Sequence, residues 1–235
     1  DMNSRETLDT QLGVFGDFHP VLPAAYQSSE LLFLANIQPT LQLEVLEQMP
    51  RPQLIVLDTM DLWINTAKEQ LTEVIKRVDV LVISEEEVRL YTGLSSILAG
   101  VRELFTLGLR YVIVKQGSYG ALLFGKDGTY FSAPSYPLEE VADPTGAGDA
   151  FAGGFVGYLS TVRPGFDGQY QFDDLKCAVV HGNITGSFAC EDFSVDRLRG
   201  LTMEDIASRY HSLVLCSHFD PTWAETYART STDKK

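Results

Sequence analysis

Short apolar runs alternate along the chain with longer segments in which apolar residues recur every three or four positions. The runs with the length of buried strands lie at 31–35, 54–58, 78–83, 111–115 and 121–124. Helical spacing is found at 39–49, 67–77, 101–107, 173–190 and 203–212, and a long helix is expected after Gly146. Strands that alternate with helices in this way predict an α/β domain whose mostly parallel sheet is covered on both faces.

Several residues mark the expected ends of these elements. Pro39 suits the first turn of a helix, and Gly108 suits a helix end. Ser84 and Glu87 have the spacing of a capping box at a helix start. Residues 10–18 partly alternate between apolar and polar, which predicts a strand that enters a proline-containing loop, and the final dozen residues are expected to be a frayed tail.

Composition and charge exclude some classes of partner. The 235 residues are 45% apolar and 21% charged, which is enough apolar material for a sizeable core. With 18 Lys and Arg against 32 Asp and Glu, the formal net charge is −14, so nucleic acids and anionic membranes are not expected partners. The sequence shows no apolar run of the ~20 residues that span a bilayer and no leader, and its three cysteines form no paired framework. We therefore expect a cytoplasmic protein.

The segment ADPTGAGDAFAGG, residues 142–154, carries the clearest chemical signal. Its small residues at Gly146, Ala147 and Gly148 leave backbone N–H groups free at the expected start of a helix. These donors, together with the positive end of the helix dipole, form an anion site that suits a phosphate group. Asp149 stands where its carboxylate can accept a proton from an attacking hydroxyl. Taken alone, however, a glycine turn with an acid in the first helical turn is common in structural roles, and the sequence has no Walker loop.

The longer motif DPTGAGDAFAGGF resembles the C-terminal signature of the ribokinase/PfkB family of carbohydrate and nucleoside kinases. VIVKQGSYGALLF resembles the strand and glycine turn that lead to the family's nucleotide site, and VLVISEEEVRLYTG resembles the segment with its Asn-x-x-Glu motif. TLDTQLGVFGDFHPVLP resembles part of the lid over the sugar. The resemblance covers residues 7–211 and implies a ribokinase-like three-layer sandwich: a partly present β lid (1–25), a catalytic domain (26–222) and a tail (223–235).

The resemblance also assigns roles to the glycine turn. Asp149 matches the catalytic base, and Gly146, Ala147 and Gly148 match the anion hole. The implied reaction is transfer of the γ-phosphate of ATP, with Mg²⁺, to a hydroxyl of a sugar, or alternatively of a nucleoside. The family's first βαβ units, which hold the main substrate-gripping residues, are not represented in this sequence.

Other matches concern the nucleotide and its metal. Glu87 matches the family Glu that helps to order Mg²⁺, whereas Ser84 replaces the family Asn, and helix capping accounts for Ser84 equally well. Lys115 aligns with the nucleotide-binding strand, where it either approaches a phosphate or only covers the strand end. The remaining matches are Gly117 and Gly120 in the nucleotide turn, Asn183 beside the adenine, and Asp143 with Thr145 at a monovalent-cation (K⁺) position. Asn183 fits an interhelical polar contact almost as well, and Asp143 can equally cap its turn.

Two further expectations follow from the resemblance. Relatives often dimerise through the lid strands, and the edge near residues 10–18 suits such a homodimer, but the sequence leaves the oligomeric state open. The rival from another class is a catalytically silent family member that acts as a binding or assembly module. The serine at position 84 favours that rival, whereas the intact GAGD motif and Glu87 disfavour it.

Overall fold

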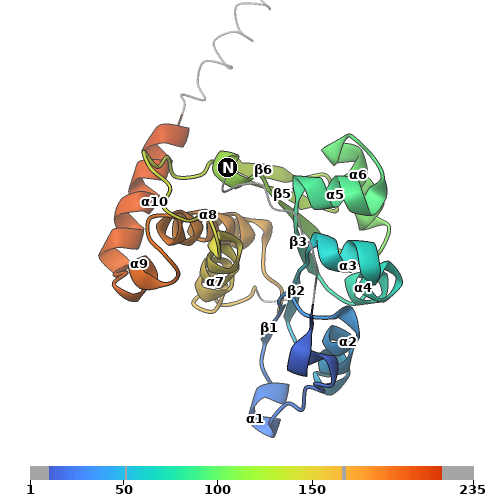
Figure 1. Cartoon of the computed structure of the whole chain (residues 1–235). Helices are drawn as coiled ribbons and strands as arrows, with labels where there is room; N and C mark the ends of the chain where they lie inside the picture. The colour runs from blue at the N-terminus through green and yellow to red at the C-terminus, as the bar shows by residue number, and fades with distance from the viewer. Residues whose placement is uncertain (1–10, 51, 166–167, 219–235) are drawn as a thin grey trace, which may run out of the picture.

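A six-stranded sheet runs through the described part of the molecule (Figure 1). The computed structural model describes residues 11–50, 52–165 and 168–218. The strands lie in sequence order and are β1 (Leu31–Leu34), β2 (Leu54–Asp58), β3 (Val80–Ser84), β4 (Tyr111–Lys115), β5 (Ala121–Gly125) and β6 (Tyr130–Ala133). Strands β1 to β4 are parallel, and β5 and β6 are added as antiparallel strands. The sheet is therefore mostly parallel, as the sequence predicts.

Helices cover both faces of this sheet. Those that follow the parallel strands are α2 (Pro39–Gln48), α3 (Asp61–Thr66), α4 (Lys68–Ile75), α5 (Glu85–Thr92) and α6 (Ile97–Phe105). Those after the sheet are α7 (Ala147–Leu159), α8 (Phe172–Ala189), α9 (Asp196–Arg199) and α10 (Met203–Ser217). Two short elements precede β1: a 3-10 helix, η1 (Gly13–Gly16), and α1 (Ala24–Gln27); a second 3-10 turn, η2 (Gly117–Tyr119), joins β4 to β5. In Figure 1, α3 to α6 lie on one side of the strands, and α7 and α8 lie on the other.

Alternation along each strand sends side chains into two separate cores. In β2, Leu57 packs among apolar residues of α3 to α6, whereas Val56 packs with α7 and α8. Phe155 of α7 is fully buried in that second core. Because successive strand residues point to opposite faces, an uninterrupted apolar strand is the expected consequence of burial on both sides. The predicted covering of both faces is confirmed.

Helices α7 and α8 approach each other closely through glycines. A Cβ atom on Gly182 would lie 2.7 Å from the Phe151 ring, and one on Gly154 would lie 2.1 Å from Thr185 Oγ1. Such short separations leave no room for side chains at these two positions. The Thr185 hydroxyl also donates to the carbonyl oxygen of Ala150, at 2.7 Å. The pair therefore forms a tightly joined unit that holds the start of α7 in place.

The predictions for individual elements had different outcomes. Strands β2 and β4 have the predicted bounds, and α2, α4, α6, α8 and α10 occupy the predicted regions. The sequence analysis missed α3 and β6. The predicted strand over 10–18 is wrong within its described part, because Gly13 adopts a φ of +55° and Gly13–Gly16 turn into a 3-10 helix. Residues 11–25 thus contain no strand of a lid, while residues 1–10 and the predicted tail 223–235 lie outside the described residues.

Among the residues that the structure describes, no helix combines the length and apolar character that crossing a membrane requires.

We predict that Gly120 is sensitive to substitution for two reasons. Its φ is +99°, and an added Cβ would lie 2.1 Å from the Ala133 carbonyl oxygen. Gly128 has a similar φ of +91° but open space around it, so Gly128→Ala is a matched control for backbone strain alone. In urea unfolding, Gly128→Ala should lose about 1–2 kcal/mol, and Gly120→Ala should lose at least ~3 kcal/mol because overpacking adds to the strain. Equal losses would contradict the close approach.

Candidate functional site

The carboxyl ends of the parallel strands bring polar residues to one edge of the sheet. Asp58 ends β2, Ser84 ends β3 and Lys115 ends β4, and Ser84 is paired with Lys115 in the strand register. In parallel α/β sheets this edge is the usual place for ligands, because loops and helix starts converge there. The start of α7 reaches the same edge, because Gly148 in its first turn lies near the Lys115 side chain.

The glycine turn at the start of α7 presents unpaired donors beside a carboxylate. Gly146 adopts a left-handed φ of +82° immediately before the helix. The Ala147 amide donates to the Pro144 carbonyl oxygen at 3.2 Å. Within the described part of the chain, the amides of Gly146, Gly148 and Asp149 have no protein acceptor, and the Asp149 side chain is exposed to solvent. The helix mouth can therefore receive an anion next to a solvent-accessible acid.

Lys115 joins this helix mouth to the neighbouring strand ends. Its Nζ lies 2.8 Å and 3.1 Å from the two carboxylate oxygens of Asp58. A Cβ atom on Gly148 would lie 3.6 Å from the same Nζ, so the ammonium group sits against the glycine turn. Lys115 therefore does more than cover the strand end, because it forms an ion pair with Asp58.

Asp58 is the residue of this edge that the sequence analysis missed. It is 9% exposed, and burial raises its pKa, although the Lys115 ammonium acts in the opposite direction and the Asp149 charge adds to the rise. The available signal was its place as the last residue of a buried strand, where an apolar run ends in an acid. Asp58 stands in the sequence as an ordinary strand terminus, and only the fold brings it to Lys115.

Ser84 and Glu87 form the predicted capping box at the start of α5. The Ser84 hydroxyl accepts from the Glu87 amide at 3.2 Å, and a Glu87 carboxylate oxygen accepts from the Ser84 amide at 2.8 Å. Ser84 therefore does cap the helix. Burial raises the pKa of Glu87, while the Ser84 amide and the Lys115 charge favour its ionised form. Glu87 is thus a second partly buried acid, and it lies close enough to Lys115 for the ammonium charge to favour its ionised form.

The other predicted nucleotide residues lie around β5 and β6. Gly117 begins the 3-10 turn between β4 and β5, and Gly120 packs against the end of β6. The Asn183 side-chain amide donates to the carbonyl oxygens of Ala133 and Pro134, at 3.0 and 3.1 Å. Asn183 therefore ties α8 to the end of β6, a polar contact between a helix and a strand.

Asp143 shapes the approach to the glycine turn. Its carboxylate accepts from the Thr145 amide at 2.9 Å, and this hydrogen bond holds the pKa of Asp143 below its ordinary value. Just before it, the Ala142 amide donates to the Cys190 carbonyl oxygen at 2.9 Å. Asp143 thus caps its turn, one of the two readings that the sequence left open, and the turn is attached to the end of α8.

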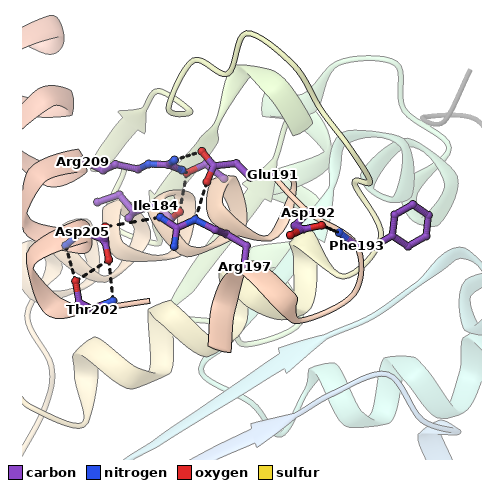
Figure 2. A network of polar contacts seen from close by, with 9 residues as sticks. Ile184, Glu191, Asp192, Phe193, Arg197, Thr202, Asp205 and Arg209 are labelled. Atoms are coloured by element: carbon purple, nitrogen blue, oxygen red, sulfur yellow. Dashed lines mark hydrogen bonds and ion pairs between the residues drawn. The ribbon is translucent and has the colours of Figure 1, made fainter. Parts of the chain in front are cut away.

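A network of charged residues lies at the end of α8, next to the point where the turn is attached (Figure 2). Arg209 of α10 donates to Glu191 and, at 2.7 Å, to the Ser187 hydroxyl, while Arg197 donates to Glu191 at 3.0 Å. The Arg209 guanidinium also lies 4.3 Å from the centre of the Tyr136 ring, which belongs to the segment between β6 and α7. This cation therefore connects α8, α10 and the segment that leads to the glycine turn.

The donor set of the site fits a phosphate group. Main-chain amides, a helix start and an ammonium group are all donors to anionic oxygen. For a metal, the described residues contain no cluster of three or more His, Cys, Asp or Glu side chains arranged to hold an ion. The protein's own contribution to an Mg²⁺ ion would therefore come from isolated carboxylates such as Glu87, with phosphate and water oxygens as the other ligands.

Comparison with known proteins identifies relatives of similar sequence. The sequence profile described as "pfkB family carbohydrate kinase" matches residues 24–197. A cytidine kinase of Thermococcus kodakarensis is 32% identical over 152 residues, which cover 61% of this chain and 52% of the relative. A nucleoside kinase of Methanocaldococcus jannaschii is 27% identical over 164 residues, covering 70% of this chain and 50% of the relative. The chain spans about half the length of these two curated relatives.

Solved structures share the fold. The nucleoside kinase structure from Methanocaldococcus jannaschii aligns with a TM-score of 0.65 and 21% identity, over 84% of this chain and 60% of the other. A fructokinase of Vibrio cholerae O395, in a fructose, ADP and calcium ion bound form, aligns with a TM-score of 0.63 and 22% identity, over 85% and 64%. At these identities the likeness concerns the fold alone.

We predict that the charge of Glu87 lowers stability at neutral pH. Burial raises its folded-state pKa above 4.5, so the stability that this group contributes is present below pH 4.5 and is lost as pH rises through the folded-state pKa. Glu87→Gln keeps the accepting oxygen of the capping box and removes the charge. It should raise the melting temperature by about 2 °C near pH 8, the shift expected of somewhat under 1 kcal/mol, and by nothing measurable near pH 4.

The control for this comparison is Glu86→Gln at the neighbouring exposed position, which should change the melting temperature little at either pH. A gain from Glu87→Gln of equal size at both pH values would contradict the burial of charge as its cause.

Proposed function

This chain belongs to the pfkB family of carbohydrate kinases, and we propose that it transfers the γ-phosphate of ATP to a hydroxyl group of a small sugar. The observation that carries the proposal is the exposed Asp149 carboxylate beside the unpaired amides at the mouth of α7. A base and an anion site at one place are what phosphoryl transfer to an alcohol requires.

In the proposed reaction, Asp149 accepts the proton of the attacking hydroxyl as the new oxygen–phosphorus bond forms and the bond to ADP breaks. The amides of Gly146 and Gly148 donate to the equatorial oxygens of the transferred group, where negative charge has to be stabilised. Lys115 adds a positive charge at the same place. When bound with the nucleotide, Mg²⁺ would neutralise further phosphate charge, and Glu87 is the carboxylate that would hold its water shell.

Other parts of the proposed site have supporting roles. We assign Gly117 and Gly120 to the nucleotide turn, Asn183 to the border of the adenine, and Asp143 with Thr145 to a monovalent cation such as K⁺. The exposed Val14, Phe15 and Val21 support an apolar contact at residues 11–25, through which a homodimer would form.

The acceptor has two candidates. The family description supports a sugar. The sequence similarity to a cytidine kinase and a nucleoside kinase supports a nucleoside as the second candidate. In both cases the reacting group is an alcohol, so the assignment of Asp149 does not depend on the choice.

We predict that Asp149→Asn in the complete protein lowers kcat by about 10³-fold, the scale of a lost general base. The affinity for MgATP, measured by calorimetry, should change by less than ~3-fold, because the amides and Lys115 remain. Asp173→Asn is the matched control, since Asp173 is also an exposed acid in the first turn of a helix, α8, but lies outside the site. Unchanged turnover in Asp149→Asn would contradict the proposal.

A panel of hexoses, ribose, cytidine, adenosine and inosine, with ATP consumption as the readout, identifies the acceptor. We expect one or more sugars to give turnover that Asp149→Asn abolishes. Turnover with nucleosides alone would establish the second candidate. Only slow ATP hydrolysis, insensitive to Asp149→Asn, would indicate a silent binding module in place of a kinase.

A further inference from the structure

Asp58 is a buried acid that the proposed proton transfer does not use. Its side chain is 12% exposed, and burial opposes its ionisation. A buried carboxylate that serves only to end a strand would be replaceable by a neutral residue at little cost. Here Lys115 engages both carboxylate oxygens, and the Thr59 amide also donates to one of them at 3.1 Å, so the place of this ion pair in the site needs an explanation.

Lys115 reaches Asp58 from a strand that is not adjacent to it. Asp58 ends β2 and Lys115 ends β4, with β3 between them. The ion pair therefore crosses the end of β3, and it brings the ammonium group within 3.6 Å of where a Cβ on Gly148 would lie. Without Asp58, the flexible lysine side chain would have no fixed acceptor among the contacts described for its Nζ.

Two features of the region around Asp58 and Lys115 indicate that its polar groups can bind a ligand. An ammonium group has three donors, and Asp58 takes two of them, at 2.8 and 3.1 Å, which leaves one for another oxygen. The adjacent Thr59 hydroxyl is buried and has no hydrogen-bond partner among the described residues. A buried polar group without a partner is unusual in a folded protein unless water or a ligand completes it.

We propose that Asp58 is a positioning residue that holds the Lys115 ammonium against the glycine turn, where its third donor binds the phosphoryl group in transfer. The inference rests on the proposed kinase function and assigns to Asp58 an action through Lys115 rather than on the substrate. Since Asp58 is negative, it weakens ground-state attraction for ATP while it fixes the cation where charge develops. Loss of the Asp58 charge is therefore expected to lower kcat more than it changes ATP affinity.

A double-mutant cycle in the complete protein tests this action. Asp58→Asn should lower kcat about tenfold with no loss of ATP affinity, and Lys115→Met should lower kcat about 10²-fold, the cost of one preorganised donor. In the Lys115→Met background, Asp58→Asn should change kcat by less than ~2-fold, because its effect depends on the lysine. The same tenfold factor in both backgrounds would overturn the proposal.

A binding measurement separates a phosphate contact from a purely structural pair. Lys115→Met should weaken ATP binding several-fold more than ADP binding, because Gly148 and Lys115 lie at the anion site proposed for the terminal phosphate. Lys115→Arg, which keeps the charge, should restore part of kcat. If the variants shift the melting temperature together but leave kcat and the ATP preference unchanged, the pair is structural and the proposal is wrong.

The Asp79 and Arg110 pair provides the matched control. It also joins an aspartate to a cation, at 3.7 Å, but at the amino ends of β3 and β4. Asp79→Asn should alter stability without a change in kcat. A folded wild-type protein with no Asp149-dependent turnover would overturn both the kinase function and the role of Asp58. Active wild-type protein with an additive cycle would overturn the role of Asp58 alone.

Discussion

The close packing of α7 on α8 is the constraint on which the site depends. Gly154 and Gly182 remove the side chains that would separate the two helices, and α7 is thereby held with its first turn at the carboxyl edge of the sheet. That placement sets the Asp149 carboxylate, the unpaired amides and the Lys115 ammonium next to one another. A larger separation between the helices would leave each of these groups present but apart, and an anion site depends on their convergence.

The anion site works against the charge of the whole molecule. The chain carries a net charge of −14, which repels a nucleotide at long range. Over short distances, the amides at the start of α7 and Lys115 present positive potential, although Asp58, Glu87 and Asp149 outnumber this one lysine. Binding of a polyphosphate to such a protein is therefore expected to depend on contact geometry rather than on attraction from the surface.

The sequence was informative where a feature is local. Apolar runs predicted β2 and β4 to the residue, and the Ser84–Glu87 spacing predicted a capping box that the structure contains. The glycine turn before α7 was also found, because its small residues and its acid are contiguous. In each case the interacting groups lie within a few positions of one another.

Features that depend on distant pairing could not be predicted in the same way. Asp58 and Lys115 are 57 positions apart, and their contact requires the strand order across β3. The strand expected over 10–18 failed because Gly13 takes a positive φ that an alternating pattern does not reveal. The role of Asn183 was left between alternatives because its acceptors, at the end of β6, belong to a strand that the sequence analysis missed.

The order of the strands has a consequence for how the chain folds. Strands β1 to β6 follow one another in the sheet as they do in the sequence. The sheet is therefore assembled mainly from contacts between segments that are neighbours in the sequence. Helices α7 and α8 must instead return across the finished sheet to cover its second face. Contacts of long sequence separation form slowly, so the apolar second face is expected to stay open to solvent, or to a chaperone, until these helices dock. The anion site at the start of α7 would then be the last region of the domain to form.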